Sequence, residues 1–141
     1  MIFLSIDYGD VRTGVAVCDK NELLASPVGV ITERRPEALA EKIKALAEQY
    51  RAERLVMGLP RYMDGSEGFR AEACRAFASL LEEKTSLPVV LRDERLTTVS
   101  AHQYLNATNT RGKKRKETVD AVSAVIILED YLASRKNGNL N

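Results

Sequence analysis

Runs of apolar residues divide the first part of the chain into three predicted strands. These runs cover residues 2–7, 13–18 and 23–31, and a short polar turn at residues 20–22 separates the second from the third. Pro27 has no N–H group to donate, which favours an edge strand or a bulge for the third segment. Because so short a turn suits a hairpin, we predict an antiparallel meander of three strands.

The spacing of apolar residues then changes to that of helices. Pro36 suits the first turn of a helix, and apolar residues continue at helical spacing from there to Tyr50. A second helical stripe follows Ser66, a residue type that is favoured at the N-cap. The last predicted helix, about residues 117–134, has little polar surface and is expected to be buried on most sides.

Two short apolar runs lie between the helices and predict two more strands, at residues 54–58 and 88–91. Strands that alternate with helices favour right-handed crossovers and parallel pairing. A short helix over about residues 97–105 and a loop over residues 106–116 are expected before the last helix. We therefore predict an α/β fold with a mixed five-stranded sheet, three antiparallel strands followed by parallel ones, and helices on both faces.

The length of 141 residues predicts a single domain, residues 1–134, followed by a frayed tail at 135–141. No segment is long and apolar enough to span a membrane, and the N-terminus lacks the features of a signal peptide. A cytoplasmic protein that contacts no membrane is therefore expected. Cys18 and Cys74 match no metal-binding spacing, so we expect two small buried side chains.

The net charge of +1 conceals one concentrated basic segment, which holds five basic residues within six positions. Without these five, 16 basic side chains face 20 acidic ones. Two interpretations stay open, a solvated loop and an arm that contacts the phosphates of a nucleic acid. The five residues of this basic segment are Arg111, Lys113, Lys114, Arg115 and Lys116.

Three acids stand at positions where chemistry could occur. Asp7 ends the first predicted strand just before a glycine-containing turn, where it either caps the turn or binds a cation. Glu94 follows the last predicted strand. Asp120 lies near the start of the most apolar helix, where the helix dipole favours a carboxylate but burial of an unpaired charge costs several kcal/mol.

These three carboxylates would meet if the last strand lies beside a central first strand. At about 4 Å and an effective dielectric of about 20, each pair would repel by about 4 kcal/mol. A divalent cation removes this repulsion, and oxygen ligands without His or Cys favour Mg²⁺ or Mn²⁺ over Zn²⁺. Two such ions would activate a water molecule and stabilise the leaving oxygen in phosphodiester hydrolysis.

Five segments of the chain resemble, in this order, the YqgF family of the RNase H-like superfamily. They are residues Asp7–Ala16, Gly58–Pro60, Met63–Ser66, Asp93–Thr98 and Lys116–Ala124, so the resemblance covers nearly the whole chain. The family is regarded as nucleases of pre-16S ribosomal RNA and is related in fold to Holliday junction resolvases. The resemblance implies an RNase H-like nuclease domain with Asp7, Glu94 and Asp120 as its catalytic and metal-binding acids. It implies one or two Mg²⁺ or Mn²⁺ ions; RNase H-like nucleases often use a fourth acid, and this chain offers no clear candidate for it.

Several residues next to these acids have predicted supporting roles. Gly9 and Gly14 would permit a tight turn and the close approach of a phosphate. Arg12 and Arg95 flank two of the acids and would either neutralise the scissile phosphate or pair with a carboxylate. Asp93 precedes Glu94 by one residue, so its side chain should face the other side of the strand and make a structural contact.

The function implied is that of a metal-dependent endonuclease on structured RNA, in maturation of the 5′ end of pre-16S ribosomal RNA during ribosome biogenesis. Its partner would be pre-rRNA within the pre-ribosomal particle, and the protein would be a monomer or a homodimer. Three alternatives remain. One is a resolvase of four-way DNA junctions, which would act as a symmetric dimer. Another is a nucleic-acid-binding module without catalysis. An actin-like ATPase is disfavoured, because such enzymes need two halves and 141 residues supply one.

Overall fold

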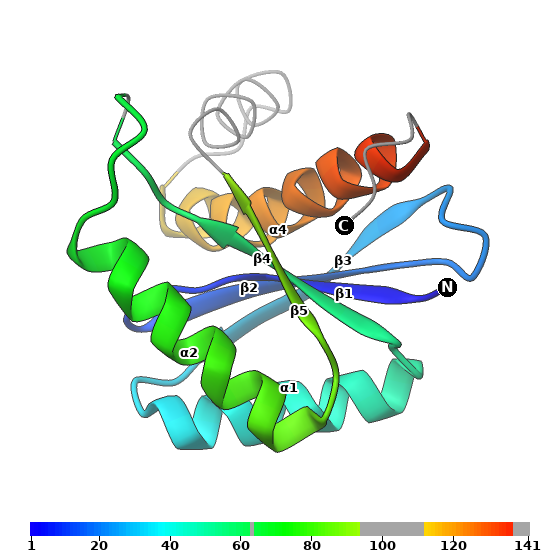
Figure 1. Ribbon diagram of the computed structural model, residues 1–141, viewed down its shortest axis with the longest axis horizontal. Helices are drawn as coiled ribbons and strands as arrows, with labels where there is room; N and C mark the ends of the chain where they lie inside the picture. Colours follow the sequence, from blue (N-terminus) through cyan, green and yellow to red (C-terminus); the bar gives the residue numbers. More distant parts are fainter. Residues whose placement is uncertain (63, 94–111, 137–141) are drawn as a thin grey trace.

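The computed structural model describes residues 1–62, 64–93 and 112–136, and for residues 112–120 it describes the backbone alone. Five strands and three helices lie within these ranges (Figure 1). In chain order they are β1 (Phe3–Asp7), β2 (Arg12–Cys18), β3 (Ala25–Thr32), α1 (Pro36–Tyr50), β4 (Arg54–Leu59), α2 (Phe69–Thr85), β5 (Val89–Asp93) and α4 (Gly112–Lys136).

The strands form one mixed sheet in the order β3-β2-β1-β4-β5. β1 and β3 both pair antiparallel with β2, whereas β4 pairs parallel with both β1 and β5. Pro27 lies on the edge strand β3, where the pairing register shifts beside Val15 and Ala16. The predicted meander, the mixed sheet and both expectations for Pro27 are confirmed.

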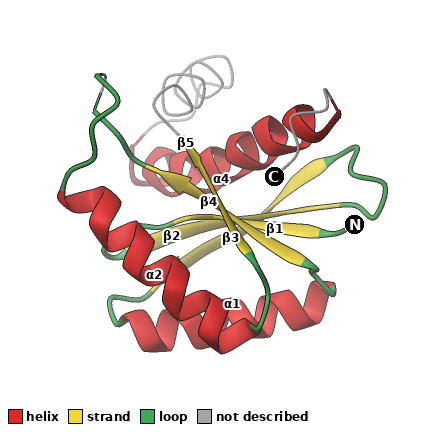
Figure 2. Cartoon of the chain, in the orientation of Figure 1, coloured by secondary structure: helices red, strands yellow, loops and turns green. Residues whose placement is uncertain are grey.

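Helices cover both faces of the sheet, as the sequence predicts. α1 and α2 lie on one face and α4 lies on the other (Figure 2). Alternate residues of β1 divide between these layers: Leu4 and Ile6 pack with α1 and α2, whereas Phe3 packs with α4. Cys18 and Cys74 are buried free thiols, as expected, and belong to opposite layers.

The start of α2 differs from the prediction. The helix begins at Phe69 with Gly68 as its N-cap, so Ser66 is not the cap. Instead, the hydroxyl of Ser66 donates to the Oδ1 atom of Asp64 at 2.6 Å, and its backbone N–H donates to the same oxygen at 2.9 Å. This local turn satisfies Ser66 before the helix begins. Phe69, the first residue of the helix, is exposed.

α4 begins earlier than predicted, because Gly112 and the residues that follow it are helical. Residues 113–136 include Lys, Arg and Glu, which favour helices, and contain no Gly or Pro that would interrupt one. The loop predicted over residues 106–116 is therefore wrong for its last five positions. The remainder of that loop and the short helix predicted at residues 97–105 lie outside the described residues.

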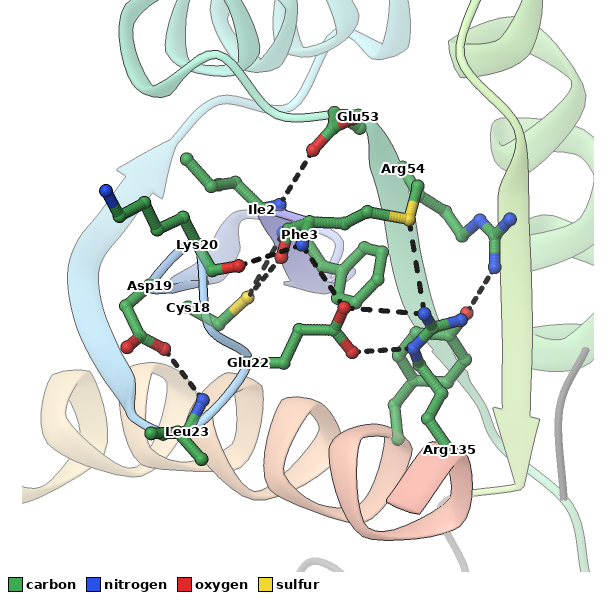
Figure 3. Close-up of polar contacts among 12 residues, drawn as sticks. Ile2, Phe3, Cys18, Asp19, Lys20, Glu22, Leu23, Glu53, Arg54 and Arg135 are labelled. Atoms are coloured by element: carbon green, nitrogen blue, oxygen red, sulfur yellow. Dashed lines mark hydrogen bonds and ion pairs between the residues drawn. The ribbon is translucent and has the colours of Figure 1, made fainter. Parts of the chain in front are cut away.

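The other end of α4 extends two residues into the predicted tail and is held there. The Nε atom of Arg135 donates to the Oε1 atom of Glu22 at 2.8 Å, and its guanidinium lies 4.9 Å from the ring centroid of Phe3 (Figure 3). Glu22 also pairs with the N-terminal amine of Met1 at 3.2 Å.

Within the described parts of the chain, no helix is long and apolar enough to cross a bilayer.

We expect Glu22→Gln to lower the free energy of unfolding at pH 7 by about 1 kcal/mol, because Arg135 loses a charged acceptor. The hydrogen bond from Arg135 lowers the pKa of Glu22 below its ordinary value. A carboxylate whose pKa is lowered in the folded state stabilises the fold above its unfolded pKa, and this contribution is lost as the pH falls through the folded pKa. Urea unfolding at several pH values should therefore show a constant difference near neutrality and a shrinking one below about pH 4.5. A difference that widens on acidification would contradict this account.

Candidate active site

Three strands bring their carboxyl ends to the same edge of the sheet. β1, β4 and β5 are parallel, with Ile6 opposite Met57 and Leu59 opposite Asp93. Because β2 runs antiparallel to β1, it begins at this edge, at Arg12. We refer to this end of the sheet as the carboxyl edge. In parallel sheets, ligands commonly bind outside the carboxyl ends of the strands.

Asp7 lies at the carboxyl edge, on the face that α4 covers. The ring of Phe3 meets that of Tyr131 at 5.2 Å, and the hydroxyl of Ser5 donates to the carbonyl oxygen of Ala124 at 2.6 Å. Both contacts are with α4, and Asp7 follows Ser5 by two residues, so strand alternation gives it the same face. Asp7 is partly buried, and it pairs across the sheet with Gly14.

α4 runs antiparallel to β1, with its last turns against the start of that strand. Asp120 precedes Ala124 by four residues, about 6 Å along the helix axis. Asp7 lies about 7 Å beyond Ser5 along the strand. The backbone of α4 at Asp120 is thus level with the end of β1. The side chain of Asp120 lies outside the described part of the structure.

The last strand is not the neighbour of the first, so the condition under which the three carboxylates would meet at adjacent strand ends is not fulfilled. β4 separates β1 from β5, which places the ends of β1 and β5 about 10 Å apart. The reason is burial: Leu55–Leu59 of β4 are all buried, which suits an interior strand, whereas the residues of β5 are partly or fully exposed. The third predicted acid, Glu94, follows β5 in sequence and lies outside the described residues.

The end of β5 shows which face each of its side chains takes. The Nη2 atom of Arg92 lies 2.9 Å from the Oδ2 atom of Asp130 on α4, so Arg92 faces that helix. Asp93 faces the opposite side, where its Oδ2 atom lies 3.9 Å from the Nη1 atom of Arg61. The predicted structural contact of Asp93 is confirmed.

The loop after Asp7 depends on Gly9. A Cβ atom at this position would lie 2.1 Å from the carbonyl oxygen of Arg12, so no other residue fits without moving the backbone. The N–H group of Gly9 donates to the Oγ1 atom of Thr13 at 3.3 Å. The turn therefore requires glycine at this position, and the approach of a phosphate to it stays a prediction. Gly14 lies opposite Asp7 in the antiparallel pair and is buried.

The structure brings part of the predicted nucleic-acid-binding set to the carboxyl edge. Arg12 and Ala16 lie on the same face of β2 by alternation, and Ala16 packs in the α4 layer, so Arg12 shares the face of Asp7. Residues 113–116 of the basic segment form early turns of α4, which extend past the end of β1. Two further members of the set lie outside the described residues, namely Arg95 and Arg111.

Sequence reasoning missed Arg70, which fixes the loop after Asp7. Its Nη2 atom donates to the carbonyl oxygen of Tyr8 at 2.9 Å, its Nη1 atom pairs with Asp10, and its guanidinium lies 5.4 Å from the ring centroid of Tyr8. The Tyr8 ring stacks on Phe77 at 4.3 Å, and burial raises the pKa of Tyr8 above its ordinary value. No local pattern reveals this contact, because Arg70 lies 62 residues after Tyr8.

A divalent metal ion fits the chemistry of this edge. Asp7 supplies a hard oxygen donor at the end of a central strand, and Mg²⁺ and Mn²⁺ prefer such donors. Within the described ranges no three His, Cys, Asp or Glu side chains gather around a possible metal position. Two of the three predicted ligand side chains, those of Glu94 and Asp120, lie outside these ranges.

Comparison with known proteins identifies the family. The RuvX family model, described as Holliday junction resolvase, matches residues 1–134. A "Putative pre-16S rRNA nuclease" from Halothermothrix orenii is 43% identical over 132 residues, which is 94% of each chain. A protein of the same name from Rhodopirellula baltica is 44% identical over 137 residues, or 96% of this chain and 79% of the relative.

Solved structures show the same fold at low sequence identity. RuvC of Thermus thermophilus in complex with a Holliday junction substrate has a TM-score of 0.65 and 13% identity, over 98% of this chain and 96% of that one. The fowlpox virus Holliday junction resolvase has a TM-score of 0.58 and 10% identity, over 95% of this chain and 99% of that one. These neighbours confirm the RNase H-like fold. Together with the family match and the curated relatives, they confirm the resemblance to the YqgF family, and the chain belongs to the RuvX family.

Proposed function

We propose that this protein is a metal-dependent endonuclease that hydrolyses phosphodiester bonds in structured RNA. Its substrate would be the 5′ region of pre-16S ribosomal RNA, within the pre-ribosomal particle, which gives it a role in ribosome biogenesis. Relatives that are 43% and 44% identical over most of the chain carry the name of a pre-16S rRNA nuclease. The single observation that carries the proposal is the docking of α4 on β1 through Ser5 and Ala124, which makes the backbone at Asp120 level with Asp7.

Asp7, Glu94 and Asp120 are the proposed catalytic acids and the ligands of one or two Mg²⁺ or Mn²⁺ ions. Such ions, when bound, polarise a phosphoryl oxygen and lower the pKa of water. The position of Asp7 supports its role, because its backbone pairs with Gly14 of β2 and directly follows Ile6, which pairs with Met57 of β4. For Glu94, the support is that it directly follows β5, whose carboxyl end lies at the same edge.

Basic residues are proposed to hold the nucleic acid over these acids. Arg12 shares the face and the edge of Asp7, and can neutralise a phosphate there. Arg95 is proposed to do the same beside Glu94. The basic segment, which includes the first turns of α4, is proposed to contact the phosphates that flank the cleaved bond.

We expect replacement of the whole basic segment with Gln to weaken RNA binding and to flatten its dependence on salt. Each lost phosphate contact should reduce the slope of log K against log salt by roughly 0.7 for a single strand. Gln favours helices about as well as Lys and Arg, so the fold should be retained. Fluorescence anisotropy with labelled RNA at several salt concentrations measures the slope.

A matched variant controls for the change in net charge. It replaces five basic residues at other places on the surface with Gln and should leave the salt slope almost unchanged. If both variants flatten the slope equally, the basic segment acts only through overall charge. The five control residues are Lys20, Lys42, Lys44, Arg51 and Lys136.

One experiment tests the proposed function directly. The protein and its Asp7→Asn variant are incubated with precursor ribosomal RNA and with a synthetic four-way DNA junction, each in Mg²⁺ and in Mn²⁺. RNA cleavage that requires both the metal and Asp7 is the expected result. Metal-dependent cleavage of the junction alone would replace this proposal with the second candidate.

That second candidate, resolution of four-way DNA junctions, is favoured by the description of the matching family model as Holliday junction resolvase. Such an enzyme would act as a symmetric dimer with two sites that face one junction. Sedimentation at micromolar protein concentration tests this second candidate, because a strictly monomeric protein cannot supply the symmetric dimer that junction resolution requires.

A further inference from the structure

Two aromatic side chains are exposed near the carboxyl edge. Phe69 is 78% exposed and Tyr62 is 63% exposed, and within the described ranges they are the only large aromatic residues so exposed. Tyr62 follows β4, and Phe69 is the first residue of α2. Although single exposed apolar residues are ordinary, these two line one pocket.

The pocket has a volume of about 210 Å³. This lies below the roughly 300–1,000 Å³ of sites for drug-sized ligands. It is therefore suited to one planar ring system rather than to a base pair. We call it the Tyr62–Phe69 pocket, and its walls include Pro60, Arg61, Tyr62, Gly68, Phe69 and Arg70.

Tyr62 is held in place before any ligand binds. A Cβ atom at position 68 would lie 2.5 Å from the hydroxyl oxygen of Tyr62, so Gly68 is what lets the ring lie against the start of α2. The N–H group of Tyr62 donates to the carbonyl oxygen of Ser66 at 2.9 Å, and that of Gly65 donates to the carbonyl of Tyr62 at 2.8 Å. Because the backbone of Tyr62 is already held, less entropy is lost when a ligand stacks on its ring.

Two arginines connect the Tyr62–Phe69 pocket to the carboxyl edge, on the α2 side of the sheet rather than on the α4 side that Asp7 faces. Arg70 donates to the carbonyl oxygen of Tyr8, the residue that follows Asp7. Arg61 lies 3.9 Å from the carboxylate of Asp93, the last residue of β5. A ligand in this pocket would therefore sit close to the edge that carries Asp7.

The charges around the pocket argue against a phosphate as its occupant. Arg70 already pairs with Asp10, and Arg61 lies 3.3 Å from the carboxylate of Glu67. Arg75 also pairs with Glu67, at 2.7 Å. These carboxylates offset the guanidinium charges, so the surfaces left for a ligand are the faces of aromatic rings and guanidinium planes. Nucleobases stack on such surfaces, whichever base is present.

We propose that the Tyr62–Phe69 pocket binds one unpaired nucleobase of the substrate by stacking, next to the phosphodiester that is cut. This rests on the proposed nuclease function and sharpens it, because it names RNA with an unpaired nucleotide beside the cleavage site as the preferred substrate class. A base inside a duplex is stacked on its neighbours and can reach the pocket only after it is unpaired, which costs a few kcal/mol.

The chain contains no Trp, so one introduced indole reports on the pocket. Fluorescence of the Phe69→Trp variant is followed in EDTA, where no metal-dependent cleavage occurs, during titration with a single-stranded RNA and with a blunt duplex of the same sequence. We expect strong quenching by the single strand and weak quenching by the duplex. The matched control is Leu23→Trp in the β2–β3 turn, a position that is 67% exposed, and its fluorescence should not change.

Equal quenching of both indoles, or quenching of the Phe69→Trp indole that is as strong with the duplex, would overturn the proposal. No quenching by either RNA would do the same, and would leave the aromatic pair as a surface for another partner. Because this titration involves no cleavage, its outcome does not depend on whether the protein is a nuclease.

Kinetics then distinguish the pocket from the proposed function. For RNA with an unpaired nucleotide at the cut, the double variant Tyr62→Leu with Phe69→Leu should raise the KM by about tenfold and leave kcat unchanged. On fully paired RNA, the double variant should have the same KM and kcat as the wild type. Tyr62→Phe should retain the wild-type KM, because the ring remains. If cleavage requires Asp7 but the double variant behaves as wild type, the pocket proposal fails and the nuclease proposal stands. If the wild type cuts no RNA while the quenching is as expected, the nuclease proposal fails and the base pocket stands.

Discussion

Replacement of Asp7 with Asn is expected to lower the rate of phosphodiester cleavage by roughly a hundredfold to a thousandfold. The amide has nearly the size of the carboxylate but carries no charge, so it binds a divalent cation poorly and cannot balance that cation's charge. Asp7 lies at the end of the central strand, and its backbone pairs with Gly14, which the substitution does not affect. Single-turnover cleavage of labelled precursor RNA measures the rate, and thermal unfolding checks that the fold is retained.

The control for this prediction removes a carboxylate from another part of the molecule. Glu129 is exposed on α4, and Glu129→Gln changes the net charge by the same amount as Asp7→Asn. This variant should cleave at the wild-type rate. If Asp7→Asn also cleaves at the wild-type rate, the carboxyl edge is not the active site.

Tyr131→Ala should lower the free energy of unfolding by about 3–5 kcal/mol, the cost of removing a large aromatic side chain from a core. Tyr131 is 0% exposed and is the largest of the fully buried side chains in the described part of the chain. Its ring packs edge-on against Phe3, and its hydroxyl accepts a hydrogen bond from the Nη1 atom of Arg54 at 2.6 Å. The substitution thus removes both the packing of α4 on β1 and a contact with β4. Urea unfolding gives the difference.

Two further substitutions separate the parts of this effect. Tyr131→Phe keeps the ring and should cost only about 1 kcal/mol, for the lost hydrogen bond to Arg54. Tyr62→Ala makes the same truncation at a side chain that is 63% exposed, and should cost less than about 1 kcal/mol. If Tyr131→Ala cost no more than Tyr62→Ala, the packing of α4 would contribute little to the stability of the protein.

The sequence predicted those parts of the fold that local chemistry determines. Pro27 marks an edge strand with a shifted register because it cannot donate a hydrogen bond, and Pro36 begins α1 because its missing N–H group is not needed there. The boundaries were less predictable where alternatives compete locally. Ser66 could cap a helix but instead closes a turn with Asp64, and the basic residues 113–116 could lie in a loop but continue α4.

The site could be predicted only in part, because its geometry depends on the order of the strands. The position of Asp7 at the end of β1 is a local property, and the sequence predicted it correctly. That β4 separates β1 from β5 follows from the burial of β4 on both faces, which a run as short as 54–58 does not determine. The contact of Arg70 with Tyr8 joins residues far apart in the sequence, and no pattern along the chain marks it.

The docking of α4 has a consequence for how the protein is made. The sheet face that carries Phe3 and Val56 is covered by Ala124, Leu128 and Tyr131, which the ribosome synthesises after all five strands. While the chain is still growing, the layer that holds α1 and α2 can pack, but the opposite face stays open to chaperones and proteases. A chain that is broken off before α4 would keep this face exposed and be prone to aggregation.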